Sequence, residues 1–219
     1  MEESKMTEQE SLQLISQMIN KAKDSYHDKG IGPVLWGSVI TICSIVTFFT
    51  LQYNLKLPFD IWLLTLVAII PQIFIASKAK KERKIKNYND DAMDYVWMCF
   101  GIAIFLLVHI NSNLINILND YFKDYRALGG KLPGFNYYSY SSAMMLLLYG
   151  IPTIITGGIM KFKPMLYGGI LCWICCVISV YTNFKIDLLL TALSATCAWL
   201  IPGIILWRRY KNGKSCTNV

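Results

Sequence analysis

The stretch "GPVLWGSVITICSIVTFFTLQY", residues 32–53, decides the fold class because it contains no charged side chain. About 18 to 20 consecutive apolar residues, wound as an α-helix, cross the roughly 30 Å hydrocarbon layer of a bilayer. We therefore predict that this stretch forms a membrane-spanning helix. Its proline falls in the first turn, where a missing backbone N–H is tolerated.

Five more apolar runs follow, and they predict spans at residues 59–77, 95–113, 142–160, 164–182 and 186–207. None has Asp, Glu, Lys or Arg in its central part, although polar residues blur the outer end of the third run. The chain of 219 residues is 54% hydrophobic and only 16% charged, whereas soluble domains are about 25% charged. The sequence predicts an all-α, polytopic membrane protein with six transmembrane helices within residues 31–207.

The distribution of Lys and Arg predicts the orientation. If the N-terminus is cytoplasmic, sixteen of the 21 Lys and Arg residues fall in the inner segments, as the positive-inside rule requires. Both termini, including the tail at residues 208–219, are then cytoplasmic. The densest run, Lys78 to Lys86, suits a topogenic loop beside lipid headgroups, and an anionic-lipid or nucleic-acid patch is the competing interpretation. We expect no direct nucleic-acid partner. Residues 1–30 lack a cleavable signal sequence, so we expect the first span to direct insertion.

Residues 1–30 are predicted to contain a cytoplasmic amphipathic helix. Thr7 and Glu10 have the spacing of a capping box, and apolar residues then recur every three or four positions. The resulting face is a candidate for partner docking, for a short oligomerisation seam, or for packing on the membrane surface. It consists of Leu12, Ile15, Ile19, Ala22 and Tyr26.

Residues 33–80 resemble residues 164–211 when position n is aligned with position n+131. The prolines Pro33 and Pro71 match Pro164 and Pro202. This predicts a duplicated hairpin of two spans. Such repeats occur in transporters, with the substrate site between the copies, but they also arise by duplication of a purely structural hairpin.

Few residues in the sequence are candidates for catalysis, redox chemistry or metal binding. Cys172, Cys175 and Cys176 form a candidate thiol cluster, yet no cation lies nearby in the sequence to stabilise a thiolate. Asp60 and Asp187 begin the second and sixth spans and are interpreted as helix caps. We expect no enzymatic activity, no catalytic residues, no metal site and no cofactor. The segment after residue 113, up to Leu128, is expected to be a helix lying along the outer surface.

Three motifs carry a resemblance to a known group of proteins. They are "ESLQLISQMINKAK" from Glu10 to Lys23, "LWG" from Leu35 to Gly37, and "TGGIMKFKPMLYGG" from Thr156 to Gly169. In these the chain resembles a family of uncharacterised multi-pass membrane proteins of Bacteroidota-type bacteria. The resemblance implies an N-terminal amphipathic helix, several spans and a partnership with a small winged-helix regulator, and it implies no activity.

The leading hypothesis is an inner-membrane sensor, scaffold or regulator that acts through its N-terminal helix. Its expected partners are membrane lipids, a cytoplasmic regulatory protein and further copies of the chain. The alternative is a small uncoupled transporter or lipid-interacting protein built on the duplicated hairpin. An intramembrane thiol oxidoreductase is the third hypothesis.

Overall fold

The computed structural model describes residues 9, 12–13, 30–82, 88–130 and 137–215, and within these residues it contains helices and no strand. The all-α prediction is confirmed for this part of the chain. Its helices are α2 (Ile31–Gln52), α3 (Leu63–Glu82), α4 (Tyr88–Ala127), α5 (Tyr137–Ile159), α6 (Lys163–Ser179), α7 (Phe184–Ala195), the π-helix η1 (Thr196–Leu200) and α8 (Ile201–Ser215).

Five helical stretches of the described part are long and apolar enough to cross a membrane. They are Ile31–Gln52, Leu63–Lys81, Asp91–Ala127, Tyr137–Ile159 and Phe184–Asn212, the last of which joins α7, η1 and α8. Helix α6 is apolar but has 17 residues. At 1.5 Å per residue it is roughly 26 Å long, slightly less than the hydrocarbon layer. Five spans thus meet the length requirement, and a sixth stays a prediction.

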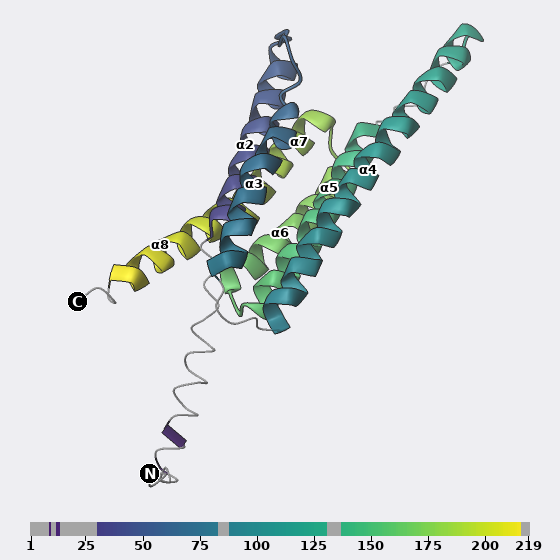
Figure 1. Ribbon diagram of the computed structural model, residues 1–219. Coiled ribbons are helices and arrows are strands. Elements are labelled where there is room, and N and C mark those ends of the chain that lie inside the picture. Colours follow the sequence, from purple (N-terminus) through teal and green to yellow (C-terminus); the bar gives the residue numbers. More distant parts are fainter. Residues whose placement is uncertain (1–8, 10–11, 14–29, 83–87, 131–136, 216–219) are drawn as a thin grey trace.

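The helices form a bundle in which α6 and α7 occupy the middle (Figure 1). Helix α2 packs on α7 and η1, and α5 packs along α6 as an antiparallel hairpin. The outer positions are held by α3, which packs mainly on α2, and by α4, which packs mainly on α5. Both outer helices therefore expose most of their apolar side chains, as expected where lipid covers them.

Helix α4 is longer than the predicted third span, since it continues as one helix of 40 residues to Ala127. Its length of about 60 Å is twice the hydrocarbon thickness, and its end projects past the neighbouring helices (Figure 1). No Gly or Pro interrupts it between Gly101 and Gly129. The expectation of a separate helix lying along the outer surface is therefore wrong.

A glycine ends α4. Gly129 has a φ of +80°, and the N–H of Gly130 bonds to the Tyr125 carbonyl at 3.0 Å. This is the Schellman arrangement, which needs a left-handed residue that glycine adopts without steric cost.

The predicted cytoplasmic tail is partly helical. Helix α8 runs to Ser215 and leaves the bundle at an angle to the other helices (Figure 1). The Arg209 Cζ atom lies 5.3 Å from the centroid of the Phe162 ring, and the Lys211 Nζ atom lies 5.9 Å from the centroid of the Trp207 ring. Lys and Arg are good helix formers, and these ring contacts give their cationic heads a partner. Residues 208–215 thus extend the last helix.

Candidate functional site

The helix after α7 is irregular in the middle of the bundle. Over Thr196–Leu200 it forms a π-helical turn, and the N–H of Ile201 bonds to the Thr196 carbonyl five residues back. Pro202 follows, and a proline supplies no N–H and crowds the carbonyl four residues before it. The wider π-helical turn makes room for the pyrrolidine ring of Pro202. Such π-bulges frequently occur at functional sites.

Two glycines on different helices pack closely against this turn. A Cβ on Gly37 of α2 would lie 2.5 Å from the Leu200 nitrogen, and a Cβ on Gly168 of α6 would lie 2.5 Å from the Ala198 Cα. Only a residue without a side chain permits such close approach of two backbones. We call Gly37, Gly168 and η1 the central junction. Gly37 and Gly168 are also equivalent positions in the proposed repeat.

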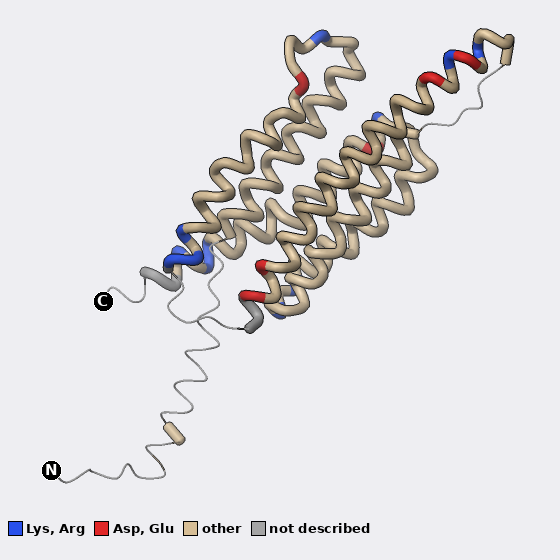
Figure 2. The backbone as a smooth tube through the Cα atoms, turned by 45° about the vertical axis from the view of Figure 1, so that its right-hand side comes forward, with Lys and Arg blue, Asp and Glu red and all other residues tan. Residues whose placement is uncertain are grey.

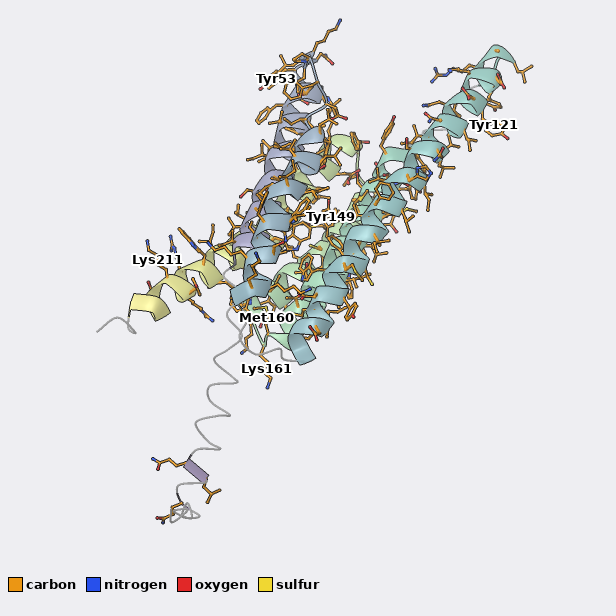
Figure 3. The ribbon with its side chains drawn as sticks, in the orientation of Figure 1. Tyr53, Tyr121, Tyr149, Met160, Lys161 and Lys211 are labelled. Carbon is orange, nitrogen blue, oxygen red and sulfur yellow. The ribbon has the colours of Figure 1, made fainter. Side chains whose placement is uncertain are left out.

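The central junction carries an aromatic cluster that reaches α4 and α5. The Trp199 indole packs against the rings of Tyr149 and Phe100, with centroid-to-centroid distances of 4.8 Å and 6.0 Å. Its N–H donates to the Thr153 hydroxyl at 2.8 Å, which in turn donates to the Tyr149 carbonyl at 2.6 Å. Trp97 of α4 donates to Thr156 at 3.2 Å. Figure 3 shows Tyr149 in the middle of the bundle, far from the labelled residues at its ends.

The start of α2 is packed on α8. A Cβ on Gly30 would lie 2.3 Å from the Gly203 carbonyl oxygen, and one on Gly203 would lie 2.8 Å from the Val34 nitrogen. Gly30 has a φ of +67°, which turns the chain into α2. Gly30, at the start of the described stretch 30–82, therefore lies against α8, only a few residues from the central junction.

A carboxylate is buried at the opposite end. Asp187 lies in the first turn of α7 with none of its surface exposed. One carboxylate oxygen, Oδ1, accepts a hydrogen bond from the Thr182 hydroxyl. Ser139 lies beside the carboxylate, and its hydroxyl donates to the Thr182 carbonyl at 3.2 Å. The other oxygen, Oδ2, has no hydrogen-bond partner among the described residues.

The prediction that Asp60 and Asp187 are helix caps is half right. Asp60 is exposed, and its Oδ1 accepts from the Trp62 N–H at 3.0 Å before α3 begins. Asp187 is not the N-cap, which is Asn183. The sequence contained a signal for this burial, because the spacing of Asp187, Thr191 and Ser194 places three polar residues on one helical face. All three are buried in the structure.

Cations gather at one end of the bundle (Figure 2). That end holds the last turn of α3, the α5–α6 turn and α8 (Figure 2). The described cations of this end are Lys78, Lys80, Lys81, Lys161, Lys163, Arg208, Arg209 and Lys211. The opposite end carries Lys56, Lys123, Arg126 and Lys185. The segments that the sequence analysis groups together as rich in Lys and Arg therefore lie at the same end of the bundle.

The candidate docking face lies almost entirely outside the described residues. Leu12 is described and is 67% exposed. Ile15, Ile19, Ala22 and Tyr26 fall outside the described ranges, so the amphipathic helix stays a prediction.

The candidate thiol cluster lies on α6. Cys172 and Cys175 are buried and Cys176 is partly buried, and all three are free thiols. Cys172 belongs to the same packed core as Tyr149 and Trp199. Because a disulfide exchange partner has to reach the sulfur atom, this burial favours a packing role.

These features define a helical protein of the membrane-spanning kind, with a packed aromatic centre and one cationic end. No family model, curated protein or solved structure matches the chain. The resemblance to multi-pass proteins of Bacteroidota-type bacteria consequently rests on its quoted motifs alone.

Proposed function

We propose that this chain is a six-span protein of the bacterial inner membrane that works without enzymatic activity as a sensor or regulator. Its N-terminal amphipathic helix recruits a cytoplasmic regulatory protein, and changes in the bundle alter that recruitment. Both termini lie on the cytoplasmic side.

One observation carries this proposal. The residue at which the N-terminal segment enters the bundle, Gly30, is packed against Gly203 of α8, next to the central junction. Interiors are close-packed, so a shift at such a contact is transmitted to its neighbours. A change in how α4 or α6 packs on η1 would therefore reach the start of α2, and with it the segment that we expect to bind the partner.

The cationic end supports the proposed orientation. Lys and Arg are retained on the cytoplasmic side during insertion, and Gly30 packs on α8, the helix that carries Arg208, Arg209 and Lys211 at this end. A helix of 17 residues such as α6 can serve as the sixth span, since a short helix is accommodated by local thinning of the bilayer.

The alternative of a transporter built on the duplicated hairpin has less support from the packing. Transport between the copies would need a hydrated space between α2 and the continuous stretch of α7, η1 and α8. At Gly37 and Leu200 the backbones of α2 and η1 are instead in close contact.

The test is co-purification of partner proteins from the native membrane with the full-length chain. Replacing Ile15 and Ile19 by Glu should abolish recruitment, because it places charge on the apolar face. Gln17→Glu adds charge to the opposite face of the same predicted helix and should leave recruitment intact. Identical partner profiles for the Ile15→Glu/Ile19→Glu protein and the unmodified protein would refute the docking role.

A further inference from the structure

We propose that the cluster around Asp187 is a binding site for a sodium ion taken up from the outer side of the membrane. The site comprises the Asp187 carboxylate together with Ser179, Thr182 and Ser139. It is independent of the N-terminal partner proposed above.

The first argument is the unmatched carboxylate oxygen. Asp187 is fully buried, yet Oδ2 has no hydrogen-bond partner within the described part of the chain. A buried ionised carboxylate without a partner is strongly unfavourable. The first turn of α7 stabilises negative charge, but no backbone N–H of that turn reaches Oδ2. The Ser139 hydroxyl lies beside the carboxylate but donates to the Thr182 carbonyl, so no donor among the described residues bonds to Oδ2.

A second oxygen nearby is in the same situation. Ser179 is fully buried, and its hydroxyl has no partner among the described residues. The backbone of Ser179 lies close to Asp187, because the Thr182 hydroxyl contacts both the Ser179 carbonyl, at 3.4 Å, and Asp187 Oδ1. Two buried oxygens with free lone pairs in one cluster suit a ligand that accepts electron pairs from both.

A protonated carboxyl group satisfies this arrangement less well. A single proton on Oδ2 would neutralise the carboxylate, whereas the Ser179 hydroxyl also lacks a partner among the described residues. A hard cation instead binds carboxylate, hydroxyl and carbonyl oxygens together. It would engage Oδ2 and the Ser179 hydroxyl without needing a donor on either group.

The charge of the cluster selects a monovalent ion. Asp187 is its only ionisable member, and the described residues contain no group of three or more His, Cys, Asp or Glu that could hold a metal ion. A divalent ion would retain a net positive charge in this buried place. Ser179 is the last residue of α6, and the carbonyl end of a helix carries partial negative charge that favours a cation.

The position of the cluster gives the ion a short route from the outer side. Thr182 is partly exposed, and Asn183, the N-cap of α7, is exposed. Ser139 lies in the first turn of α5, close to the same end of the bundle. An ion from that side would reach the cluster past the exposed α6–α7 turn.

The experiment uses the full-length protein reconstituted in lipid nanodiscs. Its thermal unfolding midpoint is measured while sodium chloride replaces choline chloride at constant ionic strength and pH. A ligand that binds only the folded state raises stability in proportion to the logarithm of its concentration above Kd. We expect the midpoint to rise steadily with the logarithm of the sodium concentration, and radioactive sodium to bind saturably to one site per chain.

Asp187→Asn keeps the shape of the side chain and the acceptor for Thr182 but removes the charge, and should abolish both effects. Asp60→Asn removes an exposed carboxylate at the same end and should leave both intact. Ser179→Ala keeps the charge and should weaken sodium binding about tenfold, a difference of about 1.4 kcal/mol. It tests the site even if the Asp187→Asn protein does not fold.

Equal midpoints in sodium and choline for the unmodified protein would overturn the proposal. So would a sodium-dependent rise of the midpoint, or binding of one sodium ion per chain, that survives in the Asp187→Asn protein. Stabilisation that depends on pH and not on sodium would also overturn it, and would make Asp187 a site for a proton.

Discussion

The indole N–H of Trp199 donates to the Thr153 hydroxyl at 2.8 Å, and this hydrogen bond joins the π-helical turn η1 to α5 in the centre of the bundle. Thr153 is fully buried, and Trp199 is 3% exposed. A buried indole N–H needs an acceptor, and the Thr153 hydroxyl supplies it. The bond therefore fixes both the ring and the turn that carries it.

Thr153→Val should test this bond, because valine has nearly the same shape and lacks the hydroxyl. It leaves the Trp199 N–H buried without an acceptor, and we expect a loss of about 1 to 2 kcal/mol of unfolding free energy. Thr47→Val is the matched control, since the Thr47 hydroxyl bonds only to the carbonyl of Cys43 in its own helix. Equal stability of the two variants in detergent would contradict the role of the bond.

Gly37→Ala should separate α2 from η1. The added Cβ would meet the Leu200 backbone, which cannot move aside as a flexible side chain can, and we expect a loss of about 1 to 3 kcal/mol. In Gly101→Ala the added Cβ meets nothing within 4 Å, so this helical position should gain about 0.5 to 1 kcal/mol. Thermal unfolding of both proteins is the measurement, and a stabilised Gly37→Ala protein would rule out the close contact.

Phe100→Ala should loosen α4 from the bundle. Phe100 contacts the rings of Trp97, Tyr149 and Trp199, and we expect its removal to cost about 2 to 3 kcal/mol. Phe105 lies on the same helix and is 72% exposed, so Phe105→Ala serves as the control, with little change expected. The unfolding midpoint in nanodiscs distinguishes them, and similar losses for both would show that the aromatic cluster does not hold α4.

The orientation predicts which lysines face the cell exterior. In a protein without native cysteines, Lys56→Cys and Lys185→Cys should react with a membrane-impermeant maleimide added to intact cells. Lys161→Cys and Lys211→Cys should react only after the membrane is opened. Labelling of position 161 from the outside would reverse the proposed topology.

The sequence predicted five of the spans, because the length of an apolar run is a local property, and the sixth stays a prediction. Span boundaries depended on neighbouring contacts and were less accurate. The second span was expected from residue 59, yet α3 begins at Leu63, because Asp60 accepts the Trp62 N–H and shapes a turn there. The third was expected to end at residue 113, yet no helix-breaking residue stands before Gly129.

The candidate sites were predicted less well, for a physical reason. A lone Asp near the start of an apolar run is typical of a helix N-cap. Only the packing of α5, α6 and α7 makes Asp187 a buried group. Trp199 likewise reads as one more apolar residue. Its hydrogen bond to Thr153 joins positions 46 residues apart, which no local pattern reveals.

From its sequence alone this chain is a helical membrane protein with its cations biased toward one set of segments, because hydrophobicity and charge act residue by residue. Tertiary structure alone decided that Gly37 and Gly168 meet the same π-helical turn and that Trp199 ties α4 and α5 to it. It also decided that Asp187 is left with an oxygen that has no hydrogen-bond partner among the described residues, at the end of the bundle opposite the cationic end. Close packing and hydrogen bonding between helices depend on which residues distant in the chain come together, and folding sets that arrangement.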